Sequence, residues 1–151
     1  MSHFTDETKL TRINENTWRG YINGQWSIGD NPNGGYLVAN AMNAIRELAP
    51  DHPDPLSVTA HYLRPGLPDT GCDIEARMIR RGRTLTTASA SLSQDGKSRI
   101  EVLAAFGDLM TPGAPNAVKN QLTIPAPVIP KPEDCPVRSA KEPVSYTHLT
   151  L

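Results

Sequence analysis

The chain has 151 residues, a net charge of −1 at pH 7 and two cysteines, Cys72 and Cys135. This length is typical of one domain that buries most of its apolar surface. The near-neutral charge excludes the broad basic surface that nucleic-acid binding requires, so we expect no nucleic-acid partner and only a local anion site. Because the chain shows no signal-peptide pattern and no long apolar run, and has few cysteines, we expect a reduced, cytoplasmic protein without membrane spans.

The first regular elements are predicted between Thr17 and Ile28. Two short runs of strand-forming residues flank Asn23-Gly24, which is the strongest short signal for a two-residue β-hairpin turn. We therefore predict a hairpin here, with Trp18 and Trp26 packed near one another.

An amphipathic helix of about fifteen residues is predicted after Asn33-Gly34-Gly35. On a wheel of 3.6 residues per turn, its apolar residues occupy an arc of roughly 140°. The apolar face holds Leu37, Val38, Ala41, Met42, Ile45, Leu48 and Ala49, and the polar face holds Asn40, Asn43, Arg46 and Glu47. Prolines at positions 50, 53 and 55 then end the helix, since they lack a backbone donor.

Downstream of the helix the apolar period changes from 3.6 to 2, which is typical of strands. Residues 56–62 and 72–78 alternate in this way, and two further runs follow on either side of Asp95-Gly96. The order predicts a meander of long antiparallel strands with tight turns at Arg81-Gly82 and Asp95-Gly96. A long helix before such strands predicts an α+β fold in which a curved sheet wraps the helix.

Three segments in fixed order carry a family resemblance: Asn33-Gly34-Gly35 before the helix, the strand Leu56-Ser-Val-Thr-Ala-His-Tyr-Leu-Arg-Pro-Gly66, and the turn Arg80-Arg-Gly-Arg-Thr84. Over roughly residues 15–135 the chain resembles the N-terminal half of an acyl-CoA thioesterase of the double hot-dog type. The resemblance implies a hot-dog fold, with one long central helix wrapped by a curved antiparallel sheet. It also implies hydrolysis of fatty or medium-chain acyl-CoA to free acid and CoA, without a cofactor.

The same resemblance implies a domain organisation. Residues 1–110 would be a hot-dog domain, and residues 111–143, which hold eight of the fourteen prolines, would be an interdomain linker. A second hot-dog domain is then expected to follow and is absent. Residues 144–151 fit neither part and resemble a vector-derived tail. Because hot-dog sheets continue edge to edge, we expect a second domain or another copy of the chain as partner.

Asn33, Gly34 and Gly35 are the candidates for contact with the thioester carbonyl. Backbone N–H groups at a helix start offer free donors and the positive end of the helix dipole. A tight entry from loop to helix is the alternative role for the glycines. His61 either lines the acyl tunnel or domain interface, or is a partly exposed strand histidine.

Arg64, Arg81 and Arg83, with Arg80, are the candidates for the phosphate groups of CoA. Guanidinium groups bind phosphate well, although a solvated turn would have the same sequence. The two cysteines and four histidines show no zinc spacing, so we expect no metal site.

The residue that would activate water is not evident in this chain. The polar helix face offers amides, Glu47 lies near the far end of the helix, and Asp30 fits a turn or capping role. The resemblance implies that the acid, hydroxyl and amide residues of catalysis come from the second domain. A non-catalytic acyl- or CoA-binding module is therefore an alternative, and a hydratase or dehydratase with a carboxylate beside His61 is a less favoured one.

Overall fold

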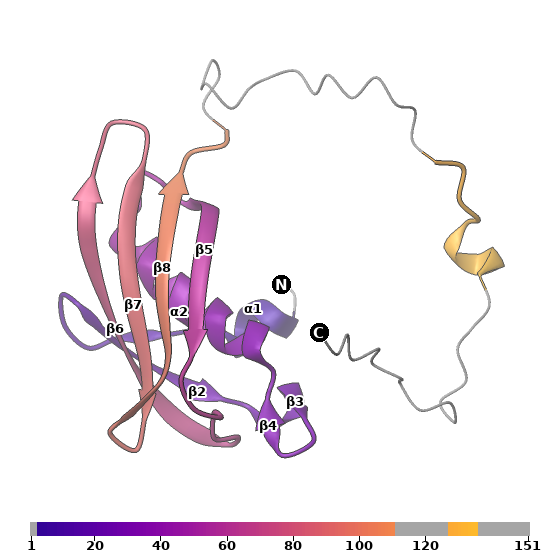
Figure 1. The fold of residues 1–151 in the computed structure, drawn as a ribbon, viewed down its shortest axis with the longest axis horizontal. Coiled ribbons are helices and arrows are strands. Elements are labelled where there is room, and N and C mark those ends of the chain that lie inside the picture. The colour runs from indigo at the N-terminus through magenta and orange to yellow at the C-terminus, as the bar shows by residue number, and fades with distance from the viewer. Residues whose placement is uncertain (1–2, 111–126, 136–151) are drawn as a thin grey trace, which may run out of the picture. The chain divides into compact units, whose positions relative to one another are not determined.

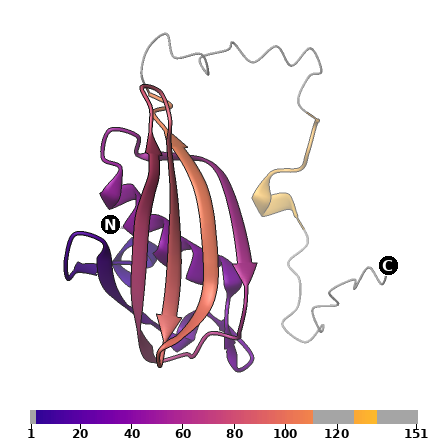
Figure 2. The same ribbon diagram turned by 60° about the vertical axis from the view of Figure 1, so that its left-hand side comes forward.

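The computed structural model describes residues 3–110 and 127–135. A six-stranded antiparallel sheet curves around one long helix, α2 (Figures 1 and 2).

The chain divides into Met1–Ala117 and Val118–Leu151. The elements of the first unit are α1 (His3–Glu7), β1 (Thr11–Arg12), β2 (Thr17–Ile22), the 3₁₀ helix η1 (Gly24–Trp26), β3 (Ser27–Ile28), β4 (Asn31–Pro32), α2 (Gly34–Leu48), β5 (Asp54–Tyr62), β6 (Thr70–Arg81), β7 (Thr86–Gln94) and β8 (Lys97–Gly107). In the second, η2 (Pro132–Asp134) lies within the predicted linker; residues 144–151, the predicted tail, lie outside the described residues.

The predicted helix is confirmed as α2, and its two ends have clear physical causes. At the start, Asn33 Oδ1 accepts hydrogen bonds from the N–H groups of Gly35 and Tyr36, at 2.8 and 3.4 Å. This is the bonding expected of an N-cap asparagine. At the end, the N–H of Ala49 donates to the carbonyls of Ile45 and Arg46, and Pro50 follows.

The strand order in the sheet is β1-β2-β6-β7-β8-β5, which confirms the predicted meander of β6, β7 and β8. The turn between β7 and β8 places Asp95 and Gly96 at φ 51° and 67°. Positive φ at both central residues is what a type I′ hairpin turn requires. The chain leaves α2, forms β5 at one edge of the sheet, and returns through β6, so β5 pairs with β8 rather than with its sequence neighbour.

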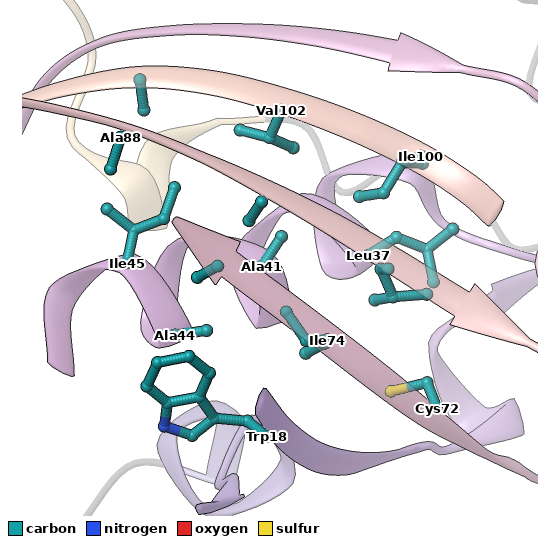
Figure 3. Packing of buried hydrophobic residues seen from close by; sticks show 14 of the residues in the cluster. Trp18, Leu37, Ala41, Ala44, Ile45, Cys72, Ile74, Ala88, Ile100 and Val102 are labelled. Carbon is teal, nitrogen blue, oxygen red and sulfur yellow. The ribbon is translucent and has the colours of Figure 1, made fainter. Parts of the chain in front are cut away.

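The hydrophobic core lies between α2 and the concave face of the sheet. Figure 3 shows Trp18, Ile74, Ala41 and Ile45 within it. Every second residue of β7 is buried, including Ala88 and Ala90. Small side chains at these central positions let a helix pack close to the strand, and larger apolar side chains fill the space on either side.

The predicted hairpin around Asn23-Gly24 is wrong. β2 pairs with β1 and β6, while β3 pairs with β4. Asn23 instead caps η1, its Oδ1 accepting from the N–H of Gln25 at 3.0 Å. The N–H of Gly24 donates to Asp69 Oδ1 at 2.8 Å, a partner 45 residues away that a local turn signal does not include.

The two tryptophans contact different residues, and the expected packing of Trp18 near Trp26 is not found among the described contacts. Trp18 is fully buried, and its Nε1 donates to Glu47 Oε2 at 2.6 Å. Trp26 stacks on Tyr36 with a centroid separation of 5.7 Å and meets Phe4 edge-on at 5.1 Å.

One residue of the predicted polar helix face is in the interior. Asn40 is fully buried, and its Nδ2 donates to the carbonyl of Tyr36 at 2.9 Å. The side chain faces β2, because a Cβ placed on Gly20 would lie 3.7 Å from Asn40 Oδ1. Next to it, Asn43 Nδ2 donates to the carbonyl of Thr8. The segment before the helix thus covers a second side of α2, which a helical wheel cannot show.

Candidate functional site

The start of α2 lies between two open pockets. Gly34 lines the first, of about 370 Å³, which we call the Arg64 pocket; its other lining residues are Pro32, Leu37, Tyr62, Leu63, Arg64, Pro65 and Gly66. Gly35 lines the second, of about 390 Å³, which we call the aromatic pocket; its other lining residues are Phe4, Gln25, Trp26, Ser27, Ile28, Asn33 and Tyr36. The predicted residues Asn33, Gly34 and Gly35 therefore separate the two pockets.

The expectation that both glycines offer free N–H groups holds only for Gly34. The Asn33 side chain accepts from Gly35 N–H and Tyr36 N–H, and the Asn33 carbonyl accepts from Leu37 N–H at 3.2 Å. Among the described residues, Gly34 N–H has no acceptor. The helix start therefore presents one backbone donor to a thioester carbonyl or an oxyanion.

Tyr62, at the end of β5, lies against Gly34. A Cβ placed on Gly34 would lie 2.8 Å from Tyr62 Cε1 and 3.0 Å from Tyr62 Oη. Position 34 therefore fits glycine, because a larger residue would displace the ring. Tyr62 is 57% exposed and lines the Arg64 pocket.

The loop after β5 is held by the first residues of β8. The N–H groups of Leu63 and Arg64 donate to the carbonyl of Arg99, at 2.8 and 3.2 Å, and Arg64 Nη1 donates to the carbonyl of Ser98. Arg99 is only 8% exposed, and its Nη1 donates to the carbonyl of Pro65 at 3.1 Å. These bonds fix the backbone of Arg64, one of the predicted CoA-binding residues, beside the helix start.

Gln94 fixes the same loop from the last position of β7. Its Oε1 accepts from the N–H of Leu67 at 2.8 Å and its Nε2 donates to the carbonyl of Leu67 at 2.9 Å. Sequence reasoning missed Tyr62, Gln94 and Arg99 as parts of this site. For Gln94 a signal existed, because it is an amide at a core-facing position of an alternating strand.

The other two predicted arginines lie near the opposite end of α2. Arg81 forms an ion pair with Asp51, just after the helix. His52, which is buried, has Nε2 3.3 Å from the carbonyl of Arg83 and Nδ1 2.8 Å from Thr86 Oγ1. A fifteen-residue helix is about 22 Å long. The structure therefore brings Arg64 to the helix start and places Arg81 and Arg83 at its far end.

His61 is exposed on the outer face of the sheet. It lies opposite Glu101 in the β5–β8 register, whereas its neighbour Ala60 faces the core. The Glu101 carboxylate accepts from the hydroxyls of Ser91 and Ser98, both at 2.7 Å, and it has no hydrogen bond to His61. This placement matches a partly exposed strand histidine and gives no support to a His–carboxylate pair beside the helix.

No carboxylate lies in the first turn of α2. Asp30 is exposed in the preceding turn, and Glu47 is bound to Trp18 at the far end. Within residues 3–110 and 127–135, no group of three or more His, Cys, Asp or Glu side chains is placed to hold a metal ion. None of the described helices is long and apolar enough to cross a membrane.

Two groups in the first unit have pKa values raised by burial. Burial raises the pKa of the Tyr36 hydroxyl, which accepts from Asn23 N–H and lies within hydrogen-bond distance of the carbonyls of Glu7 and Tyr21. Burial also raises the pKa of the Cys72 thiol to about 11. Both shifts favour the neutral form, so neither group is prepared to act as an anionic nucleophile.

Comparison with known proteins adds a family to this geometry. Residues 22–110, more than half of the chain, match the family described as the acyl-CoA thioesterase N-terminal domain. Thioesterase-like protein TwmA of Talaromyces wortmannii is 30% identical over 94 residues, which are 62% of this chain and 27% of that protein. The chain spans no more than a third of the curated relatives it matches.

Solved structures share the fold. A candidate thioesterase II from Thermobifida fusca superposes with a TM-score of 0.77 at 28% identity, covering 89% of this chain and 48% of that one. A hypothetical thioesterase from Streptococcus pneumoniae, solved with coenzyme A, has a TM-score of 0.59 at 15% identity, covering 66% of this chain and 86% of that one. The predicted hot-dog fold is therefore confirmed, and the chain belongs to the family of acyl-CoA thioesterase N-terminal domains.

Proposed function

We propose that this chain is the N-terminal half of a cytoplasmic acyl-CoA thioesterase, which hydrolyses fatty or medium-chain acyl-CoA to the free acid and CoA. The observation that carries the proposal is the free N–H of Gly34 at a helix start between two pockets, one of which is lined by Arg64. An acyl-CoA needs two such pockets, because its thioester joins an apolar acyl group to the polyanionic CoA.

The Gly34 N–H would polarise the thioester carbonyl. A donor aimed at the position where negative charge develops stabilises a tetrahedral intermediate more than it stabilises the substrate. The dipole of α2 adds to this effect, because its positive end lies at the same place. Asn33 supports the geometry by capping the next two N–H groups, so that the helix start stays ordered.

Arg64 is our first candidate for the carrier's phosphate groups, since it lies in the pocket that Gly34 lines. Arg81 and Arg83 are a second candidate, at the far end of α2, where Asp51 already neutralises Arg81. The Streptococcus pneumoniae neighbour that was solved with coenzyme A supports a ligand of this class. No cofactor or metal takes part in the proposed reaction.

The residues that activate water would come from a second hot-dog domain, with residues 111–143 as the linker. Its docking edge would be β5, which pairs on one side only among the described strands. Leu56, Val58 and Tyr62 are exposed along this strand, and His61 would lie near the boundary. An unpaired strand with exposed apolar side chains favours strand addition, by a second domain or by another copy of the chain.

A non-catalytic acyl- or CoA-binding module is the alternative function. The absence of a carboxylate from the first turn of α2 favours it, because the described residues at the helix start offer no general base. In that case the two pockets would bind acyl-CoA without turnover.

Thioester hydrolysis distinguishes these functions. Release of the CoA thiol should be measured for acyl-CoA substrates of several chain lengths, with residues 1–143 alone and joined to a second hot-dog domain. We expect the first to be inactive and the second active. Activity of residues 1–143 alone that is lost on changing Asp30, Glu47 or His61 would contradict the assignment of catalysis to a second domain. Inactivity of both, with tight binding of acyl-CoA, would favour the binding module.

A further inference from the structure

The aromatic pocket has a composition that differs from that of the Arg64 pocket. Trp26 stacks on Tyr36, and Phe4 meets both rings at centroid separations of 5.1 and 6.2 Å. Ile28, on β3, is 58% exposed at its edge. None of its lining residues is charged. The aromatic and aliphatic part of this lining favours an apolar group, and the lining offers an anion no cationic side chain.

The charges near the two pockets indicate which pocket suits each end of a thioester substrate. Beside the aromatic pocket, Glu7 of α1 accepts from Asn23 Nδ2 at 2.8 Å and lies 3.8 Å from His3 Nδ1, and the His3 ring lies 6.1 Å from that of Trp26. The lining of the aromatic pocket has no cationic side chain for a phosphate, whereas the other pocket is lined by Arg64. The aromatic pocket is therefore the favourable side for the acyl group.

The outer wall of the aromatic pocket is Phe4, on α1. No residue of α1 is buried, and α1 is held by the ring contacts of His3 and Phe4 and by hydrogen bonds, including the bond from Tyr36 Oη to the carbonyl of Glu7 at 3.0 Å. An element with few buried apolar contacts opens at low cost. Among the lining residues, Trp26 Nε1 and Ser27 Oγ are buried without a hydrogen-bond partner, so an opening that admits water to them costs less.

The family match begins at residue 22, so α1 lies outside it.

We propose that the aromatic pocket receives the acyl group of the thioester, and that Phe4 is a movable wall that sets which acyl groups fit. The CoA part then extends past Gly34 into the Arg64 pocket. This inference rests on the proposed function, because it assigns the two ends of the same substrate. The volume of about 390 Å³ is near the lower limit of small-molecule sites, roughly 300–1,000 Å³, which fits a short or medium acyl group.

Equilibrium binding to the complete chain tests the assignment. Isothermal calorimetry would compare the binding of CoA with that of S-hexyl-CoA, a thioether that cannot be hydrolysed. The ratio of the two Kd values gives the gain in affinity from the alkyl group. We expect this gain to fall by about five- to tenfold in Phe4→Ala and in Ile28→Ala, because each removes apolar surface from the pocket. Ile79→Ala is the matched control, since Ile79 is 49% exposed on β6 and does not line the pocket.

A second probe, S-hexyl-N-acetylcysteamine, carries the alkyl group without the nucleotide. If CoA does not bind but this probe binds and is weakened by Phe4→Ala, the pocket assignment holds and carrier binding by this half is wrong. If the alkyl gain is the same in wild type and both pocket variants, the pocket assignment is overturned while the proposed function stands. If neither probe binds, the pocket assignment is overturned. Thermal unfolding of each variant confirms that the core is intact.

Discussion

Tyr62 and Gly34 are in contact across the boundary between the sheet edge and the helix start. The contact is close enough that a single added carbon on residue 34 would lie within 3.0 Å of three ring atoms of Tyr62, counting its hydroxyl oxygen. The ring is at the end of an exposed side chain that lines the Arg64 pocket, so a larger residue at position 34 would displace it. The identity of residue 34 therefore controls the wall of that pocket.

We expect Gly34→Ala to be costly in the presence of Tyr62 and tolerated in its absence. In a double-mutant cycle with Tyr62→Ala, measured by urea unfolding, the coupling energy should be roughly 0.5–1.5 kcal/mol. Effects that add to within about 0.3 kcal/mol would show that the two residues do not contact each other in solution.

Glu47 is expected to stabilise the fold rather than to act on substrate. Trp18 Nε1 donates to its carboxylate at 2.6 Å, and Glu47→Ala would leave a buried indole N–H without a partner. The loss should be about 1–2 kcal/mol in the free energy of unfolding. Glu47→Gln keeps an acceptor and should lose less than half of this; equal losses in the two variants would argue against the hydrogen bond.

The His52 side chain joins the end of α2 to the turn between β6 and β7. Its replacement by alanine should cost about 2 kcal/mol, since it leaves the buried Thr86 hydroxyl without its partner. His61→Ala is the matched control, because His61 is exposed and should change stability by less than about 0.5 kcal/mol. A similar loss from both variants would show that burial of His52 is not what matters.

The stability of the first unit should fall at high pH because of Cys72. In the folded chain the pKa of this thiol is about 11, against 9.0 without the protein environment. The unfolded chain therefore releases the proton first, so stability is complete below about pH 9 and declines as pH rises toward about 11. The decline should approach roughly 3 kcal/mol, at about 1.4 kcal/mol per pKa unit between 9.0 and about 11. Urea unfolding of Cys72→Ala should show a flatter profile in this range, whereas Cys135→Ala, at an exposed position, should follow wild type.

Two arginine variants would locate the phosphate groups of the carrier. Arg64→Ala should weaken CoA binding by about tenfold, the scale of one charge-assisted hydrogen bond. The double variant Arg81→Ala, Arg83→Ala should change it by less than about twofold, because these residues lie at the other end of α2. Calorimetric titration with CoA measures both effects. A larger effect of the double variant than of Arg64→Ala would place the CoA phosphates at the turn between β6 and β7.

Local periodicity was enough to predict the main elements of the fold. The 3.6-residue pattern placed α2, and the period of two with Asp95-Gly96 placed the meander, because neighbours in sequence decide these features. The Asn23-Gly24 hairpin failed because Asp69 binds the Gly24 N–H from a distant turn. Asn40 was placed on the wrong side of the helix because β2 covers it.

The candidate site was predicted less completely than the fold. Asn33, Gly34 and Arg64 meet at one end of α2, as their assignment to one site requires. The sequence could not show that Arg81 lies at the other end, since this depends on where β5 crosses and how β6 returns. Nor could it show that Asn33 accepts the hydrogen bonds of Gly35 and Tyr36, because its side chain could equally have faced away.

The position of β5 has a consequence for how this half could be controlled. The strand has one unpaired side among the described residues, and at its end it carries Tyr62, followed by Arg64. A partner that adds a strand along β5 would therefore hold the other side of this segment, in addition to the bonds from Arg64 to Ser98 and Arg99. Association and the shaping of the pocket would then be a single event, so the pocket's affinity for its ligand would depend on partner concentration.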